Sequence, residues 1–172
     1  MPGVSYRAYA TRVSAVAAAL VAATFALTPS NTVAQGATNE IVITVKSVKA
    51  LDAFDDLSKG DIFARMTIDN DVQVTPVVAI DKKVIKPDWK LTKKVAPGVH
   101  KVKFEIIDKD LAVDDPVDIN KVASKRDLDF TVDTKSCKIE GFSSIYKCGA
   151  TISRTGAEKK KAEVAFTVSV KK

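Results

Sequence analysis

The chain has 172 residues, 28% of them charged, and a net charge of +6, which is the size of one ordinary domain. Residues 1–36 contain two arginines and no acidic residue, so the remainder carries a net charge of about +4. That balance is too small to indicate a nucleic-acid-binding protein.

The first 36 residues have the order of a secretory signal peptide. Arg7 and Arg12 precede an apolar run from Ala15 to Leu27, and small polar residues then lead to Gly36. The run is too short to span a bilayer comfortably, which makes a retained membrane anchor the weaker alternative. We therefore predict a cleaved signal peptide at 1–36, one domain at 37–172, and export to the periplasm or the extracellular space.

Alternating apolar residues predict the first strands of the domain. Two clear runs extend from Ile41 to Val45 and from Ile62 to Ile68. A turn at Asn70-Asp71 leads into Val72-Gln73-Val74. Because Pro76 follows directly, this short piece is expected to be an edge strand or a bend.

Two further strand pairs are expected in the middle of the chain. Residues 77–80 and 84–85 have the pattern of a short hairpin. Residues 90–95 and 99–108 form the second expected pair, joined by the turn Ala96-Pro97-Gly98. The single histidine, His100, follows this turn and is expected to be exposed.

The last third of the chain adds two strong strand signals. Alternation is clear at 128–132 and again at 164–170, and residues 119–125 could hold one helical turn. Residues 155–161, a glycine-containing turn followed by three lysines that we call the Gly156 turn, are expected to be solvated. Eight short strands without a long helix predict an all-β fold, an eight-stranded antiparallel β-sandwich.

Two cysteines, Cys137 and Cys148, lie close together in the predicted domain. In an exported chain an even cysteine count predicts a disulfide. Metal ligation by two thiolates alone would be unusual. We expect the disulfide to close a hairpin or long loop in the C-terminal part.

Acidic residues gather in two loops that adjoin predicted strands. Because like charges so close together repel, their gathering in a folded chain indicates a hard cation that takes several oxygen ligands. The alternative is that both loops are simply solvated, since aspartate is a common turn residue. The first loop holds Asp52, Asp55, Asp56 and Asp61, and the second holds Asp108, Asp110, Asp114, Asp115 and Asp118.

The two loops resemble those of the C2 domain, a β-sandwich family that typically binds calcium and phospholipid at one end. The resemblance extends over about residues 39–133. It suggests an exported variant of secreted bacterial type. The matching residues are Asp55 and Asp61 with Ile62-Phe63-Ala64-Arg65, then Pro87-Asp88-Trp89, and finally Asp108-Lys109-Asp110 with Asp114-Asp115.

The resemblance implies a set of calcium ligands, namely Asp55, Asp61, Asp108, Asp110 and Asp115, with Asp114 as a substitute. This sequence departs from the family in having Ile62-Phe63 where Pro-Tyr is common, a second loop one residue shorter, and the cysteine hairpin. The shorter loop leaves open whether Asp114, Asp115 or Asp118 is the last ligand. Magnesium is an alternative ion that prefers to keep its waters, whereas zinc would require histidine or cysteine.

An apolar tip and a lysine stretch fit docking on a surface. Leu111-Ala112-Val113 at the tip of the second loop is expected either to enter a lipid interface or to fold back over the sandwich end. Lysines near a membrane attract anionic headgroups at about 1 kcal/mol each, or they only keep an exposed sheet soluble. These lysines are Lys82, Lys83, Lys86, Lys90, Lys93, Lys94, Lys101 and Lys103.

No residue pattern in the chain indicates catalysis. His100 lies near no recognisable nucleophile, and no glycine-rich phosphate loop or aromatic platform accompanies the acids. We predict an exported, non-enzymatic, calcium-binding C2-like module that docks on an anionic lipid or another anionic surface group. The alternative is a protein-interaction or envelope-structural β-sandwich that binds no metal.

Overall fold

The computed structural model describes residues 38–53, 60–80 and 83–172. The chain divides into two units, Met1–Ala34 and Gln35–Lys172, and all of the described residues belong to the second unit. The predicted signal peptide at 1–36 therefore lies outside the described residues. Within them, no helix has the length and apolar character needed to cross a bilayer.

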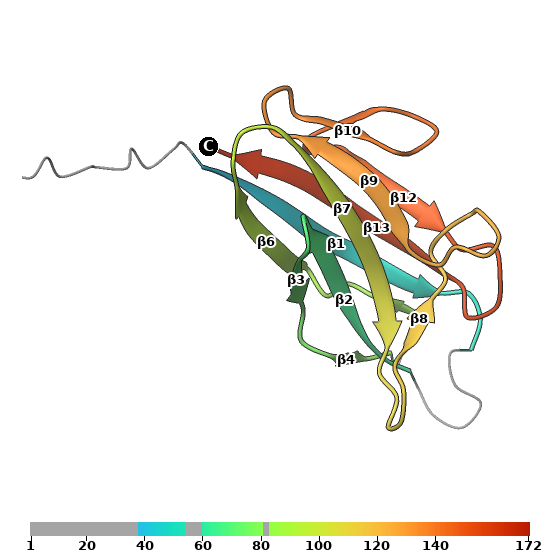
Figure 1. The fold of residues 1–172 in the computed structure, drawn as a ribbon. Helices are drawn as coiled ribbons and strands as arrows, with labels where there is room; N and C mark the ends of the chain where they lie inside the picture. Colours follow the sequence, from blue (N-terminus) through green and yellow to red (C-terminus); the bar gives the residue numbers. More distant parts are fainter. Residues whose placement is uncertain (1–37, 54–59, 81–82) are drawn as a thin grey trace, which may run out of the picture. The chain divides into compact units, whose positions relative to one another are not determined.

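The described residues form thirteen strands in two antiparallel sheets (Figure 1). The prediction of an antiparallel β-sandwich is confirmed, although the strands number thirteen rather than eight because several two- and three-residue pieces extend the sheets. The five-stranded sheet contains β12 (Thr151–Thr155), β13 (Ala162–Lys171), β1 (Asn39–Ala50), β5 (Val84–Ile85) and β6 (Trp89–Val95). The eight-stranded sheet contains β11 (Tyr146–Lys147), β10 (Lys138–Glu140), β9 (Leu128–Asp133), β7 (Val99–Asp108), β2 (Asp61–Ile68), β3 (Asp71–Val74), β4 (Val78–Ala79) and β8 (Asp115–Val117).

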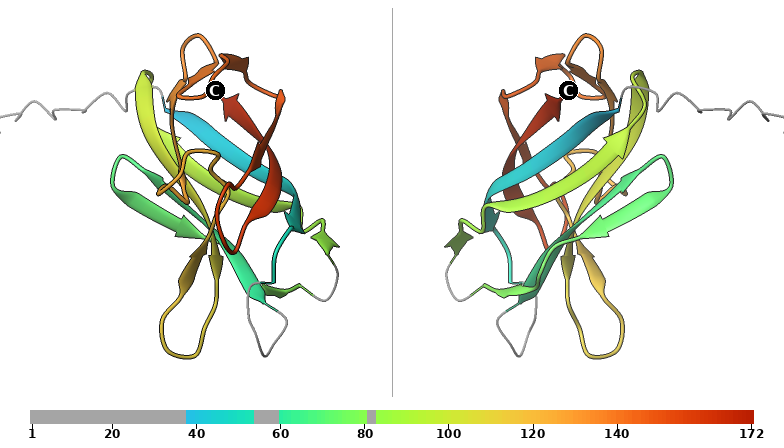
Figure 2. Two further views of the ribbon diagram at one scale, coloured as in Figure 1. Left: turned by 90° about the vertical axis from the view of Figure 1, so that its right-hand side faces the viewer. Right: turned by 90° about the vertical axis from the view of Figure 1, so that its left-hand side faces the viewer.

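The two sheets pack face to face around one hydrophobic core (Figure 2). Ile41 and Ile43 of β1 and Phe166 of β13 are fully buried, as is Phe104 of β7 on the facing sheet. The rings of Phe104 and Phe166 meet with centroids 5.0 Å apart. Since burying one such side chain stabilises a fold by about 1.5 to 3 kcal/mol, this alternation is what joins the two layers.

A bulge in β1 explains a break in its alternating pattern. The register against β13 shifts between Val45 and Ser47, so Lys46 is an extra residue on one strand. Strict alternation would point either Val45 or Val48 outward, yet both are fully buried. Lys46 itself reaches Asp88 at 3.5 Å.

The two strand pairs expected in the middle of the chain do not form, so both predictions are wrong. β4 pairs with β2 and β5 pairs with β1, so residues 77–80 and 84–85 lie in different sheets. In the same way β6 pairs with β1, whereas β7 pairs with β2 and β9. Alternation identifies a strand but does not identify its partner, and here the chain crosses twice between the layers.

The segments around β3 are partly as predicted. Asp69 and Asn70 form the turn between β2 and β3 with positive φ angles of 47° and 75°, which suit a tight hairpin. β3 is the edge of its sheet, as Pro76 indicated. His100, however, is buried rather than exposed. Both ring nitrogens have partners, since Nδ1 lies 2.5 Å from an Asp69 carboxylate oxygen and Nε2 lies 2.8 Å from the carbonyl of Ala96.

The helical turn at 119–125 does not form, and the described residues contain no helix. Asn120 explains the difference, because its side chain accepts a hydrogen bond from the amide of Val122 at 3.0 Å and donates one to the carbonyl of Asp127. Such local side-chain bonds compete with helical hydrogen bonding.

The predicted disulfide between Cys137 and Cys148 is confirmed. It closes a hairpin made of β10, β11 and the loop at 141–145. Ile139 on β10 is fully buried, so the hairpin adds to the core of the eight-stranded sheet.

Replacing both cysteines with serine is expected to lower the free energy of unfolding by about 3 kcal/mol, because the disulfide reduces the conformational entropy of the unfolded chain. Urea unfolding of the wild type with and without a reductant should give the same difference. The double-serine variant is the control, since a reductant should leave its unfolding midpoint unchanged. Equal stability of both proteins under oxidising conditions would contradict this expectation.

Candidate functional site

Three aspartates from three strands lie at one end of the eight-stranded sheet. Asp61 begins β2, Asp108 ends β7 and Asp115 begins β8. In the register Asp108 lies opposite Ile62 on one side and opposite Asp115 on the other. The amide of Lys109 donates to the carbonyl of Asp61 at 2.6 Å. The structure thus brings residues from both acidic loops to the same end of the sandwich, and Figure 1 shows the β7–β8 loop extending there beyond the sheets.

The first acidic loop is described only in part. Asp55 and Asp56 lie outside the described residues, as does Lys82. Asp52 is described, and its carboxylate accepts a long hydrogen bond of 3.4 Å from the amide of Lys161. Across the described ranges no three aspartate, glutamate, histidine or cysteine side chains are grouped closely enough to hold a metal ion. Calcium binding by this end therefore stays a prediction.

Two lysines already compensate carboxylates of the second loop. Lys109 donates to both oxygens of Asp114, at 2.8 and 3.2 Å, and this hydrogen bond is the main cause of the lowered pKa of Asp114. Lys160 donates to Asp115 at 2.6 Å. The pKa of Lys160 is raised, first by this hydrogen bond and further by the charges of Asp108 and Asp110. An ammonium group thus lies within the field of three of the aspartates assigned to calcium.

The carboxylate of Asp118 holds the loop that carries Lys160. Asp118 is fully buried. Its Oδ2 accepts hydrogen bonds from the amides of Ala157 and Glu158 at 2.8 and 2.6 Å, and its Oδ1 accepts one from the amide of Asn120 at 2.9 Å. Because three backbone donors use both oxygens, Asp118 supports the loop between β12 and β13 and is a poor candidate for the last metal ligand.

Close backbone approach fixes the same loop. A Cβ atom added to Gly156 would lie 2.1 Å from the carbonyl oxygen of Asp118, so this position accepts only glycine. The amide of Asp118 donates to the carbonyl of Lys160 at 2.9 Å, and the amide of Ala162 donates back to the carbonyl of Asp118 at 2.8 Å. The Gly156 turn, expected to be merely solvated, is held against the end of β8 and presents Lys160 to Asp115.

Sequence reasoning missed Lys160 because nothing local marks it. Asp115 and Lys160 are 45 residues apart in the chain, and Lys160 belongs to a run of three lysines that has the composition of an exposed turn. The Gly156 turn is a weak signal, since an obligatory glycine often marks close contact with another segment.

The tip of the β7–β8 loop projects into solvent. Leu111 is completely exposed, Val113 is 74% exposed, and Ala112 between them is exposed too. These three residues line an open hollow together with Asp61, Asp110 and Asp115. The alternative in which the tip folds back over the sandwich end is therefore wrong.

The predicted lysine stretch does not form one basic face. Lys90, Lys93 and Lys94 lie on β6 of the five-stranded sheet, whereas Lys101 and Lys103 lie on β7 of the other sheet. Lys93 is paired with Asp71. The remaining described members, Lys83 and Lys86, are exposed on either side of β5.

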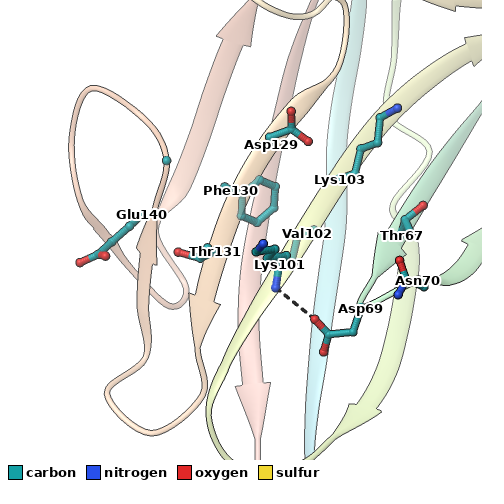
Figure 3. A pocket seen from close by; sticks show the side chains of 11 residues that line it. Thr67, Asp69, Asn70, Lys101, Val102, Lys103, Asp129, Phe130, Thr131 and Glu140 are labelled. Carbon is teal, nitrogen blue, oxygen red and sulfur yellow. Dashed lines mark hydrogen bonds between the residues drawn. The ribbon is translucent and has the colours of Figure 1, made fainter.

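An open groove runs over the outer face of the eight-stranded sheet, and Figure 3 shows Lys101 and Lys103 along it with Asp129 and Glu140. Lys103 pairs with Asp127 at 3.2 Å and with Glu105 at 3.3 Å. Burial lowers the pKa of Lys103, but the contacts with these two carboxylates outweigh it and the net direction is upward. With its cations balanced by acids, this groove has no strong attraction for an anionic headgroup.

Replacing Asp118 with asparagine is expected to lower the free energy of unfolding by about 2 to 3 kcal/mol, because the charge is lost and the amide NH₂ must face a backbone N–H. Chemical denaturation measures the change. Asp129→Asn is the matched control, since that side chain is exposed and the substitution should cost less than about 0.5 kcal/mol. Similar stabilities of the two variants would contradict the role given to Asp118.

Comparison with known proteins supports the fold without a close relative. No protein-family model and no curated protein matches this sequence. Among solved structures, a pair of C2 domains from extended synaptotagmin 2 matches with 15% identity and a TM-score of 0.52, over 95% of this chain and 48% of that one. A single C2 domain of a plant extended synaptotagmin 1 matches with 12% identity and a TM-score of 0.47, over 78% of this chain and 96% of that one.

Human group IVD cytosolic phospholipase A2, in complex with methyl gamma-linolenyl fluorophosphonate and terbium chloride, also matches, with 15% identity and a TM-score of 0.47. The match covers 77% of this chain but only 17% of the phospholipase chain, so it says nothing about that enzyme's activity here. This chain likewise spans about half of the synaptotagmin structure. The described part of the chain has the fold of a C2 domain.

Proposed function

We propose that this chain is an exported, non-catalytic docking module for anionic lipid surfaces, and that calcium bound by its acidic loops links it to the lipid. The observation that carries the proposal is the projecting β7–β8 loop, in which exposed Leu111 and Val113 lie beside Asp61, Asp110 and Asp115. Apolar side chains at a loop tip suit insertion into an interface. Carboxylates beside them would repel anionic headgroups unless a cation lies between.

The donor atoms at this end suit a hard cation such as calcium and not zinc. Asp61, Asp108, Asp110 and Asp115 offer only oxygen atoms, and the one histidine of the chain, His100, is bound to Asp69 elsewhere. Calcium prefers six to eight oxygen ligands, so further oxygens are needed, and Asp55 in the first loop is the expected source. When bound, the ion would supply positive charge and open coordination positions for a phosphate oxygen.

Lys160 would compete with calcium for the carboxylate of Asp115. Its ammonium group lies 2.6 Å from Asp115, so an incoming ion has to compete with a cation that is tethered to the chain. Competition of this kind weakens calcium binding. Weak affinity, with a dissociation constant of about 0.1 to 1 mM, is adequate in compartments where calcium is abundant, which agrees with the proposed export.

The second candidate is a sandwich that docks on a partner protein and uses no metal. It is favoured by the same lysine contacts, because Lys109 and Lys160 neutralise Asp114 and Asp115 without an added ion. Exposed Leu111 would then contact protein rather than lipid. Calcium should leave such a module unchanged.

Calcium at about 100 times its dissociation constant is expected to stabilise the wild type by about 2.7 kcal/mol and to raise Tm by several degrees relative to chelator. Asp61→Asn with Asp110→Asn should remove this response. Lys160→Met should enlarge it, because the competing ammonium is gone, and should lower Tm in chelator, because Asp115 loses its partner. Lys159→Met is the control for charge removal. A wild-type Tm that is the same in both conditions would favour the metal-free module.

Sedimentation with vesicles of phosphatidylserine and phosphatidylcholine tests the docking surface. The wild type should pellet with calcium and be released by chelator. Leu111→Ser with Val113→Ser should weaken partitioning at least about tenfold, since two apolar side chains no longer enter the interface. Ile145→Ser is the control, because it removes an exposed apolar residue from a different loop. Equal loss in the control would show that the tip has no special role.

A further inference from the structure

The disulfide-closed hairpin has no part in the proposed function, yet it is firmly built. Phe142 in its loop is half-buried, with its ring centroid 5.2 Å from that of Phe130 and 5.8 Å from that of Tyr146. The covalent bond between Cys137 and Cys148 holds both ends of the segment. The hairpin therefore forms a rigid aromatic wall at the edge of the sandwich.

Arg154 of β12 is stacked against this wall. Its Cζ lies 4.2 Å from the centroid of the Phe142 ring and 5.5 Å from that of Tyr146. One terminal nitrogen donates to the carbonyl of Ser153 at 2.8 Å, and the other lies 3.4 Å from the hydroxyl of Tyr146. These contacts fix the guanidinium plane and leave further N–H donors of Arg154 for another acceptor.

A hollow of about 340 Å³ opens beside Arg154, between the hairpin and the loop that joins β8 to β9. Lys121 and Lys125 line it from that loop, and Phe142 and Arg154 line it from the other side. Within the described ranges none of its three cations takes part in an ion pair, and the one acidic residue that lines the hollow there is Asp129. Charge at this site is therefore positive in excess.

The loop that carries the two lysines is itself anchored. Asp118 accepts the amide of Asn120, and the Asn120 side chain ties the amide of Val122 to the carbonyl of Asp127. The lysines consequently stand on a fixed backbone, and no added ordering of the loop is needed to bring them toward Arg154. A loop whose backbone is already ordered lowers the entropic cost of binding an anion, which then consists mainly of fixing the two lysine side chains.

We propose that this hollow binds a phosphate monoester group. A planar guanidinium pairs with two phosphate oxygens at once, and two ammonium groups supply the remaining positive charge. The Phe142 ring offers an apolar wall for the group that carries the phosphate. The site shares no lining residue with the hollow at the acidic end, so we expect it to bind phosphate without calcium.

Titration of the chain with inorganic phosphate in the presence of chelator tests the proposal, with backbone amide chemical shifts as the readout. Saturable shifts are expected at Gly141, Ser143 and the 120–125 loop. Lys121→Gln with Lys125→Gln should weaken binding at least about tenfold, and Arg154→Lys should do the same, because it keeps the charge but loses the two-pronged contact.

Lys147→Gln is the matched control, since Lys147 is an exposed cation on the same hairpin that does not line the hollow. Binding in this control should equal that of the wild type. The double lysine variant alters only exposed side chains, so its fold should persist even if Arg154→Lys unfolds. Failure to saturate, or equal weakening by Lys147→Gln, would overturn the proposal because it would indicate general charge attraction.

A second arm distinguishes free phosphate esters from a lipid source. Vesicles of phosphatidic acid and phosphatidylcholine carry the same monoester at a surface. Sedimentation in chelator that is lost in the double lysine variant assigns the site to a lipid headgroup, whereas phosphate binding without sedimentation assigns it to a soluble ester. Sedimentation in chelator that persists in both the double lysine variant and Arg154→Lys would overturn the phosphate site. Loss of the phosphate site as a proposal would leave the proposed calcium-dependent docking unaffected.

Discussion

The buried carboxylate of Asp118 is the contact on which the arrangement of the functional end depends. It accepts the amide of Asn120 in its own loop and the amides of Ala157 and Glu158 in the Gly156 turn, which are 39 and 40 residues away in the chain. Together with backbone hydrogen bonds between Asp118 and both Lys160 and Ala162, it holds the turn at the end of β8, where Lys160 reaches Asp115. The same carboxylate holds the start of the loop that carries Lys121 and Lys125. One buried charge, satisfied by backbone donors, therefore orders two electrostatically different surfaces.

Those two surfaces divide the charge of the domain. At the acidic end, carboxylates surround an exposed apolar tip, and Lys109 and Lys160 form ion pairs with two of them. The hollow beside the hairpin gathers cations around an aromatic ring, with Arg154 held by stacking. The modest net charge of the chain does not reveal this separation, because it adds the charges of two surfaces that would bind different partners.

Sequence predicted the layers well and their connections poorly, for a physical reason. Apolar alternation such as Ile41 to Val45 records which face of a strand is buried, and burial is what the hydrophobic effect selects. It does not record which strand lies alongside. The segments 77–85 and 90–108, expected to be hairpins within one sheet, therefore each join strands of two different sheets. The nearness of Asp61 to the second acidic loop was predictable, because both lie where an acidic stretch adjoins a strand. Lys160 and the role of Asp118 were not, since each depends on a partner about 40 residues away and on no local pattern.

The edge strand β3 has a consequence for how the protein behaves at high concentration. Val72 and Val74 are 56% and 60% exposed there, and an open edge with valines is a template for a strand of another molecule. Its four residues are too few for a long ladder, and Pro76 removes an amide donor just beyond them. Self-association into fibrils is thereby discouraged at this edge of the eight-stranded sheet.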